Sequence, residues 1–274
     1  TVACIRCVQH ICHMRLLFIF ALVALEGAVH AQQWNWAADA GGGGNVDFCY
    51  GIGTDSEGNA YWVGSASGDV DFGCGTLSTG GSDILGFLAK RAPDGTCMWV
   101  RGITTTLFEA WIYGIAIDRE NRIYVTGKFR GNADFGSGVV LDGYTGDDIF
   151  VARFDTAGTC HWARRAGGTS ADEARGISVS AEGDVYITGT CGGSTVTFDG
   201  INITNPSNSR QVVLAGYDST GTVQWARLTQ GAGGGKSARA ISIAGDQIFV
   251  TGQLGYTAAT YDGQMITPSA QGAY

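Results

Sequence analysis

From about residue 32 to its end, the chain is a series of short runs in which apolar and polar residues alternate. Ile115 and Ile117 alternate with smaller residues in one run, and Phe150, Ala152 and Phe154 do so in another. A period of two is typical of half-buried β-strands. Gly, Asn and Asp gather between the runs, where they tolerate the left-handed backbone of tight hairpins. No segment of useful length has a helical period after residue 31, so the pattern predicts an all-β fold.

The order of these runs recurs at a constant spacing. Tryptophan marks the recurrence, each copy 63 residues after the previous one: Trp36, Trp99, Trp162 and Trp225. A second block reads YGIGTDSEGNAYWVG, YGIAIDRENRIYVTG, RGISVSAEGDVYITG and RAISIAGDQIFVTG, and a third reads GFLAKRAPDGT, IFVARFDTAGT and VVLAGYDSTGT. Self-similarity at such a period is typical of propellers, solenoids and arrays.

Each unit holds two predicted hairpins, and therefore four antiparallel strands, which is the content of one propeller blade. A β-solenoid has shorter coils of parallel strands, and a β-sandwich gives no reason for tryptophan to recur at a constant spacing. The sequence thus predicts a β-propeller of four-stranded antiparallel blades, incomplete or open, with about four blades present. The recurring tryptophans are predicted to pack between blades, with a stacking platform for sugars as the alternative.

The first 31 residues have a different pattern. Met14-Arg15 precedes an apolar run from Leu16 to Leu25, and small residues at Val29 and Ala31 follow. This is typical of a secretory signal peptide cleaved before Gln32. The predicted organisation is upstream sequence over 1–13, which is not native coding sequence, a signal peptide over 14–31, and propeller repeats over 32–274. The repeat units begin near residues 36, 99, 162 and 225, and the last unit is truncated. The expected localisation is secreted or on the outer cell surface.

Composition and charge exclude some classes of binding partner. Of 274 residues 44 are Gly and 3 are Pro, and the net charge is −8. Phosphate binding needs clustered Lys and Arg, so a nucleic-acid partner is not expected. The apolar run near the N-terminus is too short to span a bilayer, so no membrane span is expected after signal peptide removal. The expected partner is an unknown protein or polysaccharide.

These blocks resemble a known repeat family. YGIAIDRENRIYVTG, DDIFVARFDTAGTCHWARRAGG and ADFGSG look like the bacterial β-propeller repeat abbreviated SBBP, and more distantly like NHL-type blades. The resemblance covers residues 34–274. It implies that the GIAID-type strand is innermost in each blade and the Trp-bearing strand outermost. It also implies a large secreted or cell-surface protein of the Bacteroidetes type.

Catalytic and metal chemistry find little support. Only His161 remains after residue 31, at a position where the sister units carry Met98 and Gln224, so no catalytic residue is assigned. The acidic residues Asp142, Asp147 and Asp148 form a conceivable cation loop, but they match neither an EF-hand nor an RTX repeat, so no metal ligand is assigned. The glycine-rich strings do not have the spacing of a phosphate loop, so no cofactor is expected.

Cysteine and aromatic positions leave two open questions. Cys49 and Cys74 belong to one unit and could form a disulfide, while Cys97 and Cys160 are expected to be small packing residues because equivalent positions lie a full blade apart.

In the segment ITTTLFEAWIY, Leu107, Phe108 and Trp111 form a possible partner-binding patch for a protein or saccharide. The alternative is that they plug the adjacent blade interface. The predicted function is a non-catalytic binding or structural scaffold. The alternative is the propeller portion of an extracellular carbohydrate-active enzyme whose catalytic part is missing.

Overall fold

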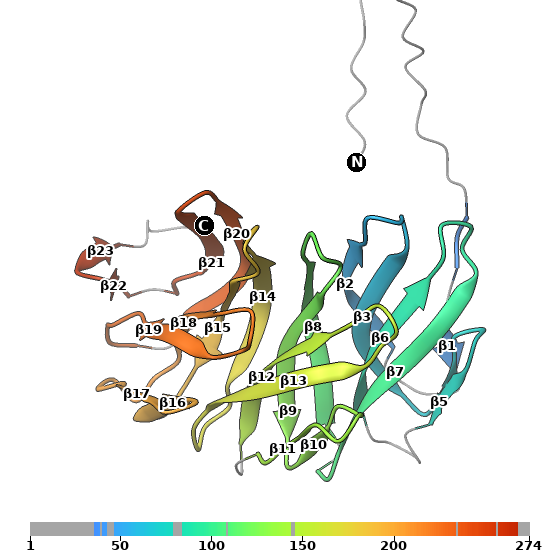
Figure 1. Cartoon of the computed structure of the whole chain (residues 1–274). Helices are drawn as coiled ribbons and strands as arrows, with labels where there is room; N and C mark the ends of the chain where they lie inside the picture. The colour runs from blue at the N-terminus through green and yellow to red at the C-terminus, as the bar shows by residue number, and fades with distance from the viewer. Residues whose placement is uncertain are drawn as a thin grey trace, which may run out of the picture. The chain divides into compact units, whose positions relative to one another are not determined.

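A computed structural model describes residues 36–38, 40–42, 47–78, 84–107, 109–143, 146–233, 235–255 and 257–267. The chain divides into two units, Thr1–Asn35 and Trp36–Tyr274, and all described residues lie in the second. The predicted upstream segment and signal peptide therefore lie outside the described residues. The described part is all-β (Figure 1).

Three four-stranded antiparallel blades and part of a fourth account for the long strands. Within each blade the strands pair in chain order, first to second to third to fourth. Blade 1 consists of β2 (Phe48–Thr54), β3 (Ala60–Ser67), β6 (Ile84–Arg91) and β7 (Cys97–Thr105). Blade 2 consists of β8 (Glu109–Ile117), β9 (Ile123–Arg130), β12 (Asp147–Phe154) and β13 (Cys160–Gly167). Blade 3 consists of β14 (Glu173–Val179), β15 (Val185–Cys191), β18 (Gln211–Tyr217) and β19 (Val223–Leu228), and blade 4 of β20 (Ser237–Ala244) and β21 (Gln247–Gln253).

This order confirms the strand assignment made from the repeats. The GIAID-type strands β2, β8 and β14 form one edge of their blades, and the tryptophan-bearing strands β7, β13 and β19 form the other. The first strands also contact one another in sequence, β2 with β8, β8 with β14, and β14 with β20. Equivalent positions one repeat apart are thus brought side by side along these strands.

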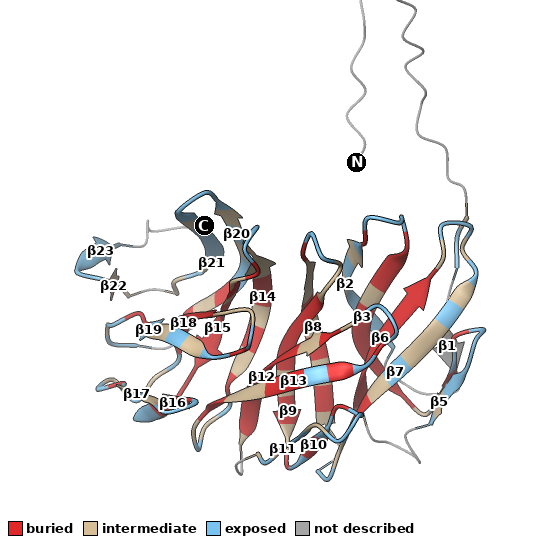
Figure 2. Cartoon of the chain, in the orientation of Figure 1, coloured by how far each residue is buried: buried red, intermediate tan, exposed pale blue. Residues whose placement is uncertain are grey.

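The hydrophobic core lies between neighbouring blades. Tyr61, Val63 and Leu88 of blade 1 pack against Val125 and Phe150 of blade 2 in one buried cluster. A second cluster joins blades 2 and 3 in the same way. Blade faces of this kind are apolar on both sides, so each sheet needs a neighbour on either side to remove its side chains from water. Strands β8 and β9, in the middle of the series, are accordingly more buried than β20 and β21 (Figure 2).

A short hairpin between the second and third strand of each blade reaches back to the preceding outer strand. The first strand of the hairpin makes this contact in each case. The pairs are β4 (Asp69–Asp71) with β1 (Gly41–Gly42), β10 (Ala133–Asp134) with β7, and β16 (Thr195–Phe198) with β13. The second strands of the three hairpins, which pair with β4, β10 and β16 in turn, are β5 (Thr76–Ser78), β11 (Val140–Leu141) and β17 (Ile201–Thr204). In the fourth unit the hairpin is β22 (Ala259–Tyr261) with β23 (Gln264–Ile266), and Thr260 bridges to Gln230 just after β19. Backbone pairing therefore links each blade to the one before it.

The recurring tryptophans link each blade to the one after it. Trp99 Nε1 donates to the carbonyl of Thr156, 3.1 Å away, and Trp162 Nε1 donates to that of Ser219, 3.4 Å away. Each acceptor lies in the turn between the third and fourth strands of the following blade, 57 residues further on. Trp36 makes the same bond to Pro93 at 3.0 Å. The prediction that these tryptophans pack between blades is therefore confirmed for these three.

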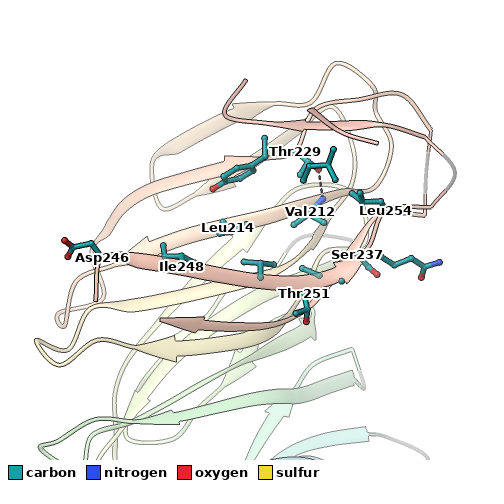
Figure 3. Close-up of a pocket in the computed structure, with 14 residues that line it drawn as sticks. Val212, Leu214, Thr229, Ser237, Asp246, Ile248, Thr251 and Leu254 are labelled. Carbon is teal, nitrogen blue, oxygen red and sulfur yellow. Dashed lines mark hydrogen bonds between the residues drawn. The ribbon is translucent and has the colours of Figure 1, made fainter. Parts of the chain in front are cut away.

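An apolar cavity of about 580 Å³ lies beside the fourth blade (Figure 3). Val212 and Leu214 of β18 and Ile248 and Val250 of β21 line it, together with Tyr261. Val212, Leu214, Ile248 and Tyr261 also belong to the apolar cluster that joins blades 3 and 4. We therefore interpret the cavity as part of this blade interface rather than as a ligand pocket.

One disulfide joins Cys74 to Cys97, with a Cα–Cα distance of 5.3 Å. Cys97 begins the fourth strand of blade 1, and Cys74 lies in the hairpin of the same blade. The sequence-based pairing of Cys49 with Cys74 is therefore wrong, and so is the view of Cys97 as a packing residue. Cys49 is exposed on β2, and Cys160 and Cys191 are buried free thiols. Strand order explains the difference, because the hairpin folds toward the outer edge of the blade, away from β2.

Peptide mapping checks this connectivity. Digestion of the non-reduced chain after alkylation is expected to give a peptide containing Cys74 linked to one containing Cys97, with Cys49 alkylated. The bond closes a loop of 23 residues, so reducing it is expected to lower the free energy of unfolding by about 3 kcal/mol. A linked pair that contains Cys49 and Cys74 would contradict the structure.

Candidate ligand-binding strip

Four aromatic side chains gather on the first strands of blades 1 and 2. We call them the aromatic strip: Phe48 and Tyr50 on β2, and Trp111 and Tyr113 on β8. Phe48 is 51% exposed and Tyr50 is 39% exposed, whereas Trp111 and Tyr113 are half-buried. A contiguous group of partly exposed rings is a candidate interaction surface.

The rings of the strip are arranged as a short ladder across the two blades. Phe48 and Trp111 stack with centroids 6.4 Å apart and planes inclined by 27°, and Trp111 and Tyr113 stack at 6.1 Å and 26°. Tyr50 meets Tyr113 edge-on at 5.1 Å. Rings at such separations support one another, so the strip is held in place before any ligand arrives.

A bulge in each first strand sets the direction of these side chains. The pairing register shifts between Cys49 and Gly51 in β2 and between Ile112 and Gly114 in β8, so Tyr50 and Tyr113 are the extra residues. Bulges often re-aim a side chain in this way.

The bulge depends on a glycine in the paired second strand. A Cβ at Gly64 would overlap the carbonyl oxygen of Phe48, and one at Gly127 would overlap that of Trp111. The same relation recurs in blade 3, where Gly189 faces the carbonyl of Glu173. The glycine that ends each YWVG, YVTG or YITG block is therefore required for this close approach.

Ion pairs border the strip on blade 2. Lys128 on β9 donates to Glu109 at 2.8 Å and to Asp147 at 3.0 Å, and its Nζ lies 5.7 Å from the centroid of the Trp111 ring. Trp111 Nε1 donates to the same Glu109 carboxylate at 2.8 Å. Arg130 is a second partner of Asp147. The indole is therefore fixed by one carboxylate and has one cation over its ring.

Blade 3 places an ion pair where blades 1 and 2 place aromatic residues. Glu173 occupies the position of Phe48 and Trp111, and Arg175 is the bulge residue in the position of Tyr50 and Tyr113. Arg175 donates two hydrogen bonds to Glu173, each 3.1 Å long, and its guanidinium lies 4.5 Å from the Tyr113 centroid. Arg210, which directly precedes β18, adds a third hydrogen bond to Glu173.

Lys128 and Arg175 stay positively charged over a wide pH range. Burial alone would lower the pKa of Lys128, but its bonds to Glu109 and Asp147 outweigh this and raise it. The pKa of Arg175 is raised in the same way by Glu173 against the effect of burial. Burial also raises the pKa of Tyr50 and Tyr113, so both phenols stay protonated. The strip therefore offers neutral rings and hydroxyl groups beside compensated charges.

The structure describes two of the three residues of the sequence-predicted patch. Trp111 belongs to the strip, Leu107 is exposed in the turn that follows β7, and Phe108 lies outside the described residues. The patch of Leu107, Phe108 and Trp111 thus remains a prediction.

Sequence reasoning missed three members of the strip, Phe48, Tyr50 and Tyr113. A signal was present, because the repeats align aromatic Phe48 with Trp111 and Tyr50 with Tyr113, whereas the third unit has Glu173 and Arg175 there.

The other candidate residues from the sequence, His161 and the acidic residues of the conceivable cation loop, lie apart from the strip or already have partners. His161 lies on an outer strand and pairs with Asp155 at 3.0 Å. Asp147, of the conceivable cation loop, is engaged by Lys128 and Arg130, and Asp148 is buried. Over the described ranges there is no group of three or more His, Cys, Asp or Glu side chains arranged to hold a metal ion. Nor does this part of the chain contain a helix long and apolar enough to cross a membrane.

Comparison with known proteins agrees with the fold. Residues 35–70 match the family model of the SBBP β-propeller repeat. The chain is also similar to the uncharacterized WD repeat-containing protein L264 of Acanthamoeba polyphaga mimivirus, at 26% identity over 174 residues. That match covers 57% of this chain and 12% of the viral protein, so the chain spans only a small part of this relative. Sequence match and strand order together identify an all-β repeat chain built from β-propeller blades.

Proposed function

We propose that this chain is an exported β-propeller repeat scaffold that binds a ligand on the aromatic strip and does not itself catalyse a reaction. The observation that carries this proposal is the gathering of four partly exposed rings from two blades, bordered by compensated ion pairs. Rigid strands present the rings, which lowers the entropic cost of binding. The signal-peptide pattern at residues 14–31 supports export, and with it an extracellular ligand.

A binding role is favoured over catalysis by the state of the charged groups. The carboxylates beside the strip, Glu109 and Glu173, are each hydrogen-bonded to a cation. Carboxylates that are already held by partners within the protein serve to position those partners. The arrangement therefore suits recognition through stacking and hydrogen bonds.

Phe48→Ala is the variant that tests this proposal most cleanly. Phe48 is half exposed, so its loss is expected to leave folding intact while reducing ligand affinity by about 10-fold, as for a ring at the centre of a contact surface. The measurement is binding of the full chain and the variant to an array of extracellular glycans and proteins, beside a broad hydrolase screen. Binding without turnover is the expected result.

Met98→Ala is the matched control, since Met98 is 50% exposed on the opposite edge of blade 1. This control should bind as the unaltered chain does. Equal binding by Phe48→Ala would exclude the strip as the site, and turnover of a polysaccharide by the chain would contradict a purely binding role.

A further inference from the structure

We propose that the ligand of the aromatic strip is a neutral polysaccharide, bound along its length rather than at an end. This rests on the proposed function, because it names the class of ligand for the same site. The four rings, the groups over their faces and the balance of nearby charges each bear on that class.

Cationic ligands fit poorly because cations already lie over two of the rings. Lys128 is 5.7 Å from the centroid of Trp111, and Arg175 is 4.5 Å from that of Tyr113. A quaternary ammonium group would compete with these side chains for the negative ring faces. It would also approach two positive charges.

An acidic ligand would be attracted only weakly, because the positive and negative charges around the strip nearly cancel. The cations are Lys128, Arg130, Arg175 and Arg210, and the carboxylates are Glu109, Asp147 and Glu173. Each cation is paired with at least one of these carboxylates. A phosphate or uronate would meet cations whose charge is already largely compensated by these carboxylates, so it would gain less than at a free cation. The paired charges therefore favour a ligand without net charge over an acidic one.

The position of the ion pairs also disfavours a protein partner. The centre of a protein interface is depleted in Lys, Glu and Asp, although Arg is enriched there. Here Glu109 bonds directly to the Trp111 indole and Lys128 lies over its ring, so residues of the depleted types are in contact with the strip itself. A flat apolar protein surface would have to bury these charges.

A sugar chain can interact with both the aromatic rings and the charged groups of the site. The C–H groups on one face of a sugar ring carry small positive charges and pack against the negative face of an aromatic ring. Its hydroxyl groups can donate to the carboxylates of Glu109 and Glu173 and accept from the neighbouring cations. Phe48 and Tyr50 are the exposed rings of the strip and are available for this contact. Trp111 and Tyr113, whose faces meet Lys128 and Arg175, lie beside them on the next blade, so more than one sugar unit can be in contact at once.

Affinity electrophoresis and calorimetry on the full chain test this proposal. The probes are laminarin, xyloglucan and dextran as neutral polysaccharides, alginate as an acidic one, and choline as a small cation. At least one neutral polysaccharide is expected to bind with an affinity that changes less than about 2-fold between 50 mM and 300 mM salt, because no ion pair is formed. Binding to short fragments of the same polysaccharide should weaken as the fragment no longer spans the ladder.

Two variants of Trp111 connect that binding to the strip. Trp111→Ala is expected to weaken it by about 30-fold, in the range of an aromatic hot spot, and Trp111→Phe by a smaller factor, since a ring is retained. Thermal unfolding of both shows whether the fold is kept, and the exposed Phe48→Ala provides the same information if Trp111→Ala does not fold. Met98→Ala should be unchanged.

The outcomes separate this inference from the proposed function. Stronger binding of alginate or choline, or strip-dependent binding of a protein alone, would overturn the neutral polysaccharide and keep the strip as a site. Neutral polysaccharide binding that all strip variants retain would overturn both. Absence of binding to every neutral probe at millimolar concentration would also overturn the inference.

Discussion

Replacing Gly127 by alanine is expected to lower the free energy of unfolding by roughly 4 kcal/mol, the size of a severe steric conflict in a packed interior. The new Cβ would overlap the carbonyl oxygen of Trp111 and come within 3.0 Å of the Phe150 ring. Because backbone rather than a flexible side chain is in the way, β8 would have to move from β9 or lose its bulge. Thermal unfolding is expected to shift down by about 10 °C for a chain of this length.

Gly127→Ala should also weaken ligand binding, and by more than the fraction of unfolded chain accounts for. The bulge at Tyr113 directs the strip, and the carbonyl of Trp111 is the group displaced. Binding measured well below the unfolding temperature should therefore be weakened as strongly as by changing the rings. Gly189→Ala, which affects the equivalent carbonyl of Glu173 in blade 3, should destabilise to a similar extent.

Gly75→Ala is the control for Gly127→Ala. A Cβ at Gly75 would meet only the Val100 side chain, at an ordinary contact distance of 3.6 Å. A change of less than about 1 kcal/mol is expected for it, as for most substitutions away from a strained or packed position. If Gly127→Ala and Gly75→Ala were equally stable, the glycine would not be what permits the bulge.

The second large effect is a loss of stability as the pH rises from about 4 to 7. Asp172, in the connection between blades 2 and 3, is fully buried. Burial raises its pKa to about 7, with the charge of Asp148 adding to the effect, although backbone amides of Gly168 and Gly192 donate to its carboxylate and act in the opposite direction. Both carboxylates lie close to Gly167, where a Cβ would come within 3.0 Å of Asp172 Oδ2.

The direction of the pH effect follows from the two protonation states. In the unfolded chain an aspartate ionises near pH 3.9, whereas in the folded chain Asp172 ionises near pH 7. Between these values the folded state holds the extra proton, so the free energy of unfolding falls as the pH rises. The contribution of Asp172 is fully present below about pH 4 and is lost above about pH 7, and it amounts to about 4 kcal/mol.

Urea unfolding at pH 4, 5, 6, 7 and 8 measures this contribution. The side chain in Asp172→Asn cannot ionise, so the free energy of unfolding of this variant should fall by about 4 kcal/mol less between pH 4 and pH 8 than that of the unaltered chain. Asparagine also removes one acceptor for the backbone amides, which costs about 1–3 kcal/mol at every pH. Asp218→Asn is the control, because hydrogen bonds from Thr220 lower the pKa of Asp218 and place its titration outside this interval. Parallel pH curves for the unaltered chain and Asp172→Asn would show that Asp172 is not protonated in the fold.

Local pattern and repetition were enough to predict the blades. Alternation in runs such as IFVARFD, with Gly, Asn and Asp between them, depends only on the two-residue period of a strand and the backbone freedom of turn residues. Repetition of Trp99 and Trp162 at a constant spacing indicated that each blade packs against a copy of itself. Both features are properties of the order of residues along the chain, so the sequence displays them directly.

Contacts between side chains that are distant in the sequence depended on the tertiary structure. Phe48 and Trp111 are 63 positions apart, and they form one surface because the bulges and the packing of β2 on β8 turn both side chains the same way. The pairing of Cys74 with Cys97 likewise requires that the hairpin fold toward the outer strand. Strand alternation and turn chemistry are local, so the chain carries them in its order of residues. The strip, the disulfide and the buried carboxylates come from backbone paths through space, and these are decided only when the blades pack together.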